Sequence, residues 1–446
     1  MTTVGPTQYI SGLVSSLDWS NVIDELMQVY RSQRIEPLED RRSDFEEKLS
    51  AWQELSSKLS DLKNAVEAIS GGSAFSVYQA TLSSSATDNP ESILTVTTSS
   101  SAQEGVYYLE VLQIAQAHQM ASKSFSSATD PLGLSGTVTI NGVDITIADT
   151  DSLYDVRDKI NSSVDGVVAS VLKVSDTEWK LLLTSEETGT ANQITVDDPG
   201  GLFDFTTTVE AQDAVLEVNS IQVTRSSNTM GDVIEGLTIE LKRAAPGTII
   251  TLTVSKDLEA IEQNIQQFVD AYNEVHSFIS DQFTYSEGTE KPLMGEVTLR
   301  GIQSNLQSKI LQTVSDLPDG WNALTFYGVS FDRYGNLSFD SSEFESKFSE
   351  DPDTTIQLFT SVASSLDDYL DDVTDPYTGL IKTKTDSLQS QIDDINEQIE
   401  RQEFLLDLKR QRLMEQFVAL EDALSQLRAL SSWLSQQIEV SFSNYT

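Results

Sequence analysis

The chain has 446 residues, of which 39% are hydrophobic, so it is long enough for several cores, yet it has no run of the roughly 20 apolar residues that span a bilayer. Lys and Arg number 28 against 70 Asp and Glu, a formal net charge of -42, and this balance argues against nucleic acid as a partner because binding a polyanion requires a basic face. The sequence contains no cysteine, which excludes disulfides, thiolate metal sites and cysteine nucleophiles.

The first predicted elements are helical. Apolar residues recur every three or four positions from Trp19 to Ile69, which is the spacing of one helix face. Pro37 predicts a kink or a restart within this segment, and the pair Gly71-Gly72 predicts its end.

From Ala74 the sequence becomes rich in Ser, Thr and β-branched residues that alternate with period two, which is typical of strands. Asn141-Gly142 lies between two alternating runs and predicts a tight hairpin. A short helix is expected from about Ser152 to Asn161. The expected strands lie at 92–97, 106–111, 137–140, 143–147, 167–174, 179–184, 214–218, 238–242 and 248–254.

Helix returns at Leu258, with apolar residues on one face as far as Ile279. A further helix is expected around 298–314, followed by a hairpin over 329–339 and short helices to about Leu370. The residues 375–379, Asp-Pro-Tyr-Thr-Gly, predict a turn.

The longest helical pattern runs from Lys382 to Val440. Its apolar positions approximate a heptad seam that Gln402 and Lys409 interrupt and that slips in register near Leu413. About 55 helical residues would reach roughly 80 Å at 1.5 Å per residue. The fold class expected is therefore α+β and multidomain, with the terminal helices paired as a coiled-coil or helical-bundle stalk and β-rich head domains inserted between them.

Residues suited to catalysis or metal binding are scarce. His118 and His276 are the only histidines and lie far apart in the sequence, so both are interpreted as structural side chains, solvated or capping. Acid pairs such as Asp197-Asp198 and Asp367-Asp368 arise by chance among 70 acidic residues. We therefore expect no catalytic residue, no metal and no cofactor.

One short segment superficially suggests a calcium loop. Asp332, Asn336 and Asp340 have suitable side chains, but Tyr334 occupies the third ligand position. A β-turn is the better interpretation.

The terminal seams are the strongest remaining signal. Heptad content alone equally fits an intramolecular bundle that binds nothing. The Ala-, Leu- and Gln-rich stretch 424–438, which includes Trp433, favours packing between molecules. The residues expected to form a filament or subunit contact are Leu26, Met27, Leu413, Phe417, Leu420, Leu424, Leu427, Trp433 and Leu434.

Several blocks resemble the flagellar filament cap proteins, the hook-associated protein 2 family. The opening 10–27, beginning Ile-Ser-Gly-Leu-Val, is similar to the start of that family, and Ser50-Ala51-Trp52 is similar to its next helix. The blocks 231–242, 251–257 and 268–273, and the C-terminal block 379–437, agree in order and spacing. Residues 132–196 resemble the hook-filament module of flagellins and hook-associated proteins. Asn219-Ser220 and Gly295-Glu296 depart from the family pattern at turns.

The resemblance implies a structural protein and no enzyme. It implies a homo-oligomeric ring of a few subunits, about five, at the filament tip, which retains exported flagellin and promotes its folding and insertion. The other implied partners are hook-filament junction proteins and a cytoplasmic export chaperone at the C-terminal helix, with no nucleic acid and no membrane insertion. The implied location is extracellular, after type III export without a cleaved signal peptide, because the N-terminus lacks a basic start and an apolar signal core.

With that architecture in view, the expected division of the chain has four parts. Residues 1–40 and 410–446 would form helical legs that contact the filament, and 41–72 with 257–409 a helical stalk domain. Residues 73–130 and 213–256 would form a β-rich head domain, and 131–212 a β-rich tip domain that contains the hook-filament module. The strand-like segments on both sides of the module are expected to close a common sheet.

Two alternatives remain at this point. A flagellin or a hook-filament junction protein would share the terminal helices and the module at 132–196, although the order of the blocks from 231 to 273 argues against it. A surface adhesin or carbohydrate-acting protein is the alternative from a different class.

Overall fold

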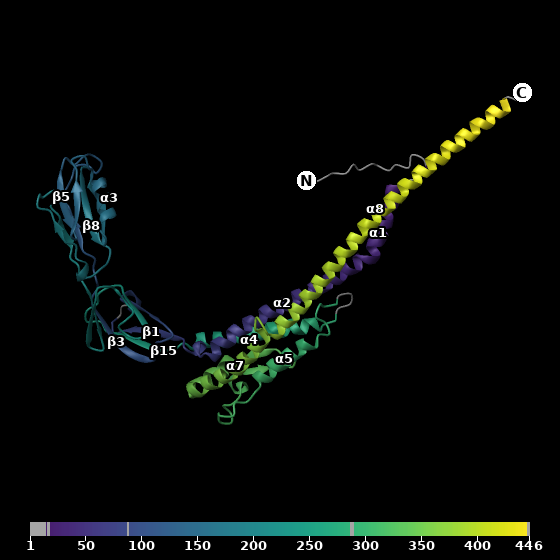
Figure 1. The fold of residues 1–446 in the computed structure, drawn as a ribbon. Coiled ribbons are helices and arrows are strands. Elements are labelled where there is room, and N and C mark those ends of the chain that lie inside the picture. Colours follow the sequence, from purple (N-terminus) through teal and green to yellow (C-terminus); the bar gives the residue numbers. More distant parts are fainter. Residues whose placement is uncertain (1–14, 16–17, 87–88, 286–289, 444–446) are drawn as a thin grey trace. The chain divides into compact units, whose positions relative to one another are not determined.

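The computed structural model describes residue 15 and residues 18–86, 89–285 and 290–443. The chain forms two compact units, one comprising 1–71 and 265–446 and the other 72–264. We call them the helical unit and the β unit. Figure 1 gives the element labels used below.

The helical unit begins with two helices separated by a single residue. α1 (Trp19–Arg34) is capped by Asp18, whose carboxylate accepts a hydrogen bond from the Asn21 amide. α2 (Glu36–Ser70) starts after Ile35 with a proline in its first turn, where the missing N–H is not needed. The chain then turns at Gly72, which has a φ of +73°. The predicted restart at Pro37 and end at Gly71-Gly72 are confirmed.

The remaining helices of this unit return after the β unit. They are α4 (Leu258–Gln282), which begins in the β unit, α5 (Val297–Ile310), α6 (Ser341–Glu350), α7 (Pro352–Thr374) and α8 (Leu380–Ser443). α5 ends four residues before the predicted Val314. The hairpin of β16 (Val329–Phe331) and β17 (Leu337–Phe339) is held on α4 by Asn273, which bonds both the amide and the carbonyl of Leu337.

The β unit contains two hydrophobic cores. The first lies within a five-stranded sheet, in the order β1-β15-β3-β11-β12, and a three-stranded sheet, β13-β14-β2. The five-stranded sheet draws strands from both sides of the 131–212 segment. Its strands, with those of the three-stranded sheet, are β1 (Tyr78–Ser84), β2 (Leu94–Thr98), β3 (Gly105–Gln113), β11 (Ala214–Val218), β12 (Ile221–Arg225), β13 (Thr229–Met230), β14 (Leu237–Leu241) and β15 (Ile250–Lys256).

The second core lies where α3 (Leu153–Ser163) packs with the sheets β10-β4-β8-β7 and β6-β5-β9. Ser152 and Asp155 cap α3 reciprocally. The predicted hairpin at Asn141-Gly142 is confirmed, since Ile140 pairs with Val143. The strands are β4 (Gln119–Ala121), β5 (Gly136–Ile140), β6 (Val143–Ile147), β7 (Val167–Ser175), β8 (Glu178–Ser185), β9 (Val196–Asp197) and β10 (Thr206–Val209).

The expected α+β multidomain class with paired terminal helices is confirmed. Six strands escaped the sequence pattern: β1, β4, β9, β10, β12 and β13. All except β1 have five residues or fewer, which is too few for period-two alternation to stand out.

Candidate interaction surface

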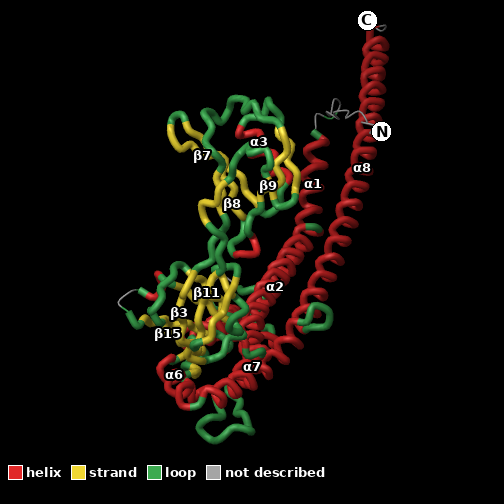
Figure 2. Tube along the Cα trace, turned by 90° about the vertical axis from the view of Figure 1, so that its left-hand side faces the viewer, coloured by secondary structure: helices red, strands yellow, loops and turns green. Residues whose placement is uncertain are grey.

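α1 and α8 come from opposite ends of the chain and lie side by side in the helical unit (Figures 1 and 2). α1 buries Ile23 and Met27, four residues apart on one face, against the neighbouring helix. At the base of the pair, Ile35 packs in a cluster with Ile395 and Ile399 of α8. We call α1 together with residues 402–424 of α8 the leg.

The leg is closed by a combination of aromatic and charged contacts. Trp19 stacks on Phe417 with ring centroids 4.3 Å apart, and its indole N–H donates to Glu421 at 2.8 Å. Arg410 meets Asp24 at 2.8 Å, with both side chains about half exposed. Exposed ion pairs of this kind contribute only about 0–1 kcal/mol each, so apolar and aromatic packing holds the leg together.

The seam of α8 contains the register slip that the sequence predicts. Leu406, Lys409, Leu413 and Phe417 follow one another at steps of three, four and four residues, where a regular heptad would alternate three and four. Two consecutive steps of four locally unwind a left-handed supercoil. Leu413 and Phe417 are nevertheless both half-buried.

Beyond the leg, α8 continues without a partner helix among the described residues (Figure 1). Residues 425–438, which we call the free end, keep the heptad spacing of the seam, yet Leu427 is 62% exposed and Trp433 56% exposed. The other exposed apolar side chains of the free end are Leu430, Leu434 and Ile438. A helix this long with an uncovered apolar face is suited to packing against another molecule.

The residues predicted as contacts fall into two groups. Met27 is buried at 7% exposure within the helical unit, and Leu413, Phe417 and Leu424 are half-buried along the seam. The exposed ones are Leu26, Leu420, Leu427, Trp433 and Leu434. The first group holds the leg together, and the second is open to a partner.

Sequence reasoning missed several exposed apolar residues. Leu430 and Ile438 continue the spacing of Leu427 and Leu434, so the same pattern would have found them. Phe404 and Leu408 are exposed off the seam, where periodicity gives no signal.

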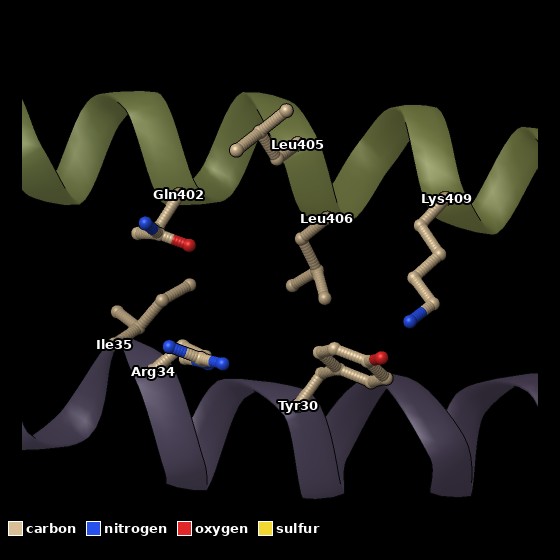
Figure 3. Close-up of a pocket in the computed structure, with 7 residues that line it drawn as sticks. All are labelled: Tyr30, Arg34, Ile35, Gln402, Leu405, Leu406 and Lys409. Carbon is tan, nitrogen blue, oxygen red and sulfur yellow. The ribbon is translucent and has the colours of Figure 1, made fainter.

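A groove lies where the break between α1 and α2 faces α8 (Figure 3). Its volume is about 220 Å³. Lys409 reaches across from α8 and places its ammonium group 3.2 Å from the ring centre of Tyr30. Its lining consists of Tyr30, Arg34, Ile35, Gln402, Leu405, Leu406 and Lys409.

The two histidines differ in one respect from what the sequence predicted. Both are structural, but they are neither solvated nor capping: they are buried and hydrogen-bonded. His118 accepts through Nδ1 from the Ile194 amide at 3.0 Å. His276 lies 2.8 Å from the Gln303 amide nitrogen and 3.1 Å from the Tyr334 carbonyl oxygen. The small number of histidines gave no information on their burial, because burial depends on the elements that pack around each ring.

The acidic residues that were considered as metal ligands or as catalytic pairs also act locally. Asp332 accepts from the amides of Tyr334 and Asn336, which confirms the β-turn interpretation. Asp198 accepts from the amides of Leu202 and Phe203. Burial raises its pKa, but these bonds and one from Asp204 outweigh burial and hold the pKa below the usual value.

The part of the chain that the structure describes holds no group of three or more His, Cys, Asp or Glu placed to bind a metal ion. None of its helices is long and apolar enough to cross a bilayer.

Comparisons with known proteins agree along most of the chain. The family model described as flagellar hook-associated protein 2 C-terminus matches residues 211–429, and that of the N-terminus matches 15–118. The flagellin hook IN motif matches 133–187. Flagellar hook-associated protein 2 of Escherichia coli strain K12 is 28% identical over 472 residues, covering 96% of this chain and 97% of that protein.

Two further relatives give the same answer. The A-type flagellar hook-associated protein 2 of Pseudomonas aeruginosa is 25% identical, with 96% of this chain and 97% of that protein covered. The crystal structure of the flagellar cap protein FliD D1-D2-D3 domains from Escherichia coli superimposes with a TM-score of 0.61 at 28% identity, covering 76% of this chain and 99% of that one. This chain therefore belongs to the flagellar hook-associated protein 2 family, whose members are structural flagellar cap proteins and not enzymes.

Proposed function

We propose that this protein caps the distal tip of a bacterial flagellar filament, outside the cell. Several copies form a ring whose β-rich parts make a plate, and the legs with their free ends reach the growing filament. The plate retains exported flagellin beneath it and promotes its folding and insertion. The family membership supports this role, and the relatives' names place them at the hook and cap of the flagellum.

The observation that carries the proposal is the uncovered apolar face of the free end. Burying one leucine side chain contributes about 1.5–3 kcal/mol. Leu427, Leu430 and Leu434 are all exposed, so this gain is available only when another molecule covers them. The filament end is the partner that fits the free end of a capping protein.

The leg also suits a contact that must be remade as each flagellin is added. Gln402 and Lys409 occupy seam positions where a regular coiled coil has apolar residues. Polar residues at such positions weaken the pairing. A loosely held leg can therefore adapt to several non-equivalent sites on the filament more readily than a tightly packed one.

The same free end would be the binding site for a cytoplasmic export chaperone, which would shield its apolar face before export. The absence of cysteine from the sequence fits a chain that passes unfolded through a type III conduit. The plate would first assemble on the hook-filament junction proteins, before flagellin arrives.

The test replaces Leu427 and Leu434 by Asp in a bacterium whose own gene is deleted. Loss of two buried leucines should cost the filament contact about 3–6 kcal/mol. We expect short or absent filaments and unpolymerised flagellin in the medium. The melting transition of the β unit should stay unchanged in the purified variant, since neither leucine lies in that unit.

A matched control adds the same charge to the other side of the free end. Ser425 and Ser432 are exposed and lie roughly opposite Leu427 and Leu434 on the helix. The variant Ser425→Asp with Ser432→Asp should leave filaments of normal length. Normal filaments and swimming with Leu427→Asp and Leu434→Asp would contradict the proposal that the free end is the filament contact.

A further inference from the structure

The groove at the break between α1 and α2 is lined by both apolar and cationic side chains (Figure 3). Ile35, Leu405 and Leu406 supply the apolar surface. Arg34 and Lys409 supply the charge, and neither makes an ion pair with any other described residue; the Lys409 ammonium group lies over the ring of Tyr30. Two cations in one groove that have no ion pair within the described residues favour a partner that carries carboxylates.

A surface with the complementary chemistry lies on the outer face of the same helix. Phe404 follows Glu400 by four residues, and Asp407 and Leu408 follow Phe404 by three and four, so the four residues share one face of α8. Phe404 is 64% exposed and Leu408 is also exposed. Neither Glu400 nor Asp407 makes an ion pair within the described part of the chain. We call these four residues the outer stripe.

The groove and the outer stripe lie at the same level along α8, because Phe404 immediately precedes Leu405 of the groove. A rotation about an axis parallel to the helix can therefore bring the stripe of one copy to the groove of the next without a shift along the axis. Since the two surfaces differ, the contact is head-to-tail, and repeated head-to-tail contacts close into a ring when the rotation is a simple fraction of a turn.

We propose that the groove is a binding site for a second copy of this chain. Phe404 of the neighbouring copy enters the groove against Tyr30, Ile35 and Leu405, and its Glu400 and Asp407 pair with Arg34 and Lys409. The volume of about 220 Å³ has room for one aromatic side chain. This inference rests on the ring in the proposed function and specifies which surfaces join its subunits at the level of the leg.

The test uses charge reversal on the full chain. The groove variant is Arg34→Glu with Lys409→Glu, and the stripe variant is Glu400→Lys with Asp407→Lys. Sedimentation velocity at about 0.15 M salt should show association weakened about tenfold or more for each variant alone. An equimolar mixture of the two should assemble again, because each mutant groove then meets an oppositely charged stripe.

Two controls separate the interface from folding and from general charge effects. Arg41→Glu with Lys48→Glu makes the same change in charge on α2, around the ring of Phe45, and should leave association unaffected. Phe404→Ala removes an exposed side chain and should weaken association while the circular dichroism of the helices stays unchanged.

Introduced thiols give an independent measurement, because the chain has no cysteine of its own. Chains with Phe404→Cys mixed with chains with Arg34→Cys should form a disulfide between the two types under mild oxidation. Association that survives the groove variant, or a mixture that fails to restore it, would overturn the groove contact and leave the capping proposal standing. A wild-type chain that stays monomeric at every concentration would instead overturn the ring itself, and this inference with it.

Discussion

Trp19 and Phe417 stack with their ring planes inclined by only 20° and their centroids 4.3 Å apart. The indole N–H is shared between Glu421, at 2.8 Å, and Ser15, at 3.1 Å. This contact joins the first turn of α1 to α8 at the point where the leg gives way to the free end. It is therefore the place at which intramolecular packing stops and an uncovered helix begins.

We expect Phe417→Ala to loosen the end of the leg. Loss of a half-buried aromatic ring and its stacking partner should cost about 2–3 kcal/mol of local stability. At about 1.4 kcal/mol per factor of ten, amide exchange in the first turns of α1 should accelerate by about thirtyfold or more. Hydrogen exchange resolved by peptide measures this. Trp433→Ala, at an exposed position, is the control, and equal exchange in both variants would show that the stacking does not hold α1 in place.

Ring assembly should depend on salt because each copy carries a net charge of -42. Screening shortens from about 30 Å at 0.01 M ionic strength to about 8 Å at 0.15 M, so repulsion between neighbouring copies is weaker at the higher salt. Sedimentation equilibrium at the two salts should show more assembly at 0.15 M. Equal or greater assembly at low salt would mean that repulsion between the acidic copies does not limit their association.

Gly236 should tolerate no side chain. Its φ is +75°, and an added Cβ would lie 2.2 Å from the backbone nitrogen of Ala102. Gly236→Ala should therefore lower the stability of the β unit by about 3 kcal/mol or more, through both the backbone conformation and the clash. Gly247 has a similar φ of +82° but open space around it, so Gly247→Ala should cost only about 1–2 kcal/mol. Thermal unfolding measures both, and equal losses would show that the close approach to Ala102 is relieved without cost.

The pair of Asp151 and Lys159 should make the stability of the β unit depend on pH. Lys159 bonds the Asp151 carboxylate at 2.5 Å and the Ala148 amide donates to it at 2.7 Å. The hydrogen bond from Lys159, followed by that from Ala148, lowers the pKa of Asp151. A lowered folded-state pKa gives stability that is complete above the unfolded value of about 3.9 and is lost as pH falls through the folded one.

The melting temperature of the wild type should accordingly exceed that of Asp151→Asn most at pH 7, and the difference should shrink as the pH is lowered below about 4. Asp149→Asn removes one charge from an exposed neighbour and should change little at any pH. A difference between wild type and Asp151→Asn that stayed constant down to pH 2 would assign the effect to shape and not to charge.

Much of the local structure could be read from the sequence. Pro37 and Gly72 mark real helix ends, Asn141-Gly142 makes the hairpin, and Ser152 with Asp155 begins α3. These features are local because a turn or a cap is decided by the φ and hydrogen-bonding preferences of a few adjacent residues. The order of the sequence blocks also indicated the family, because that order can be recognised without knowing how the elements pack.

The sequence did not predict which side chains are buried. Leu26 and Met27 are neighbours in the predicted contact, yet Leu26 is 42% exposed and Met27 is buried. Both histidines were expected to be solvated or capping side chains, and both are buried. A residue's own type does not specify which elements pack over it, and strands as short as β4 and β9 depend on their neighbours for their existence.

The sequence by itself determined that α8 is one long helix with an apolar stripe, because a repeat of three and four residues is a property of the helix alone. The tertiary structure decided which part of that stripe is covered. α1 meets α8 only as far as Trp19 reaches, opposite Phe417 and Glu421, so the same heptad pattern is intramolecular core on one side of that contact and open surface on the other. Covering a face requires a partner of sufficient length at the right position, and no pattern within one helix contains that information.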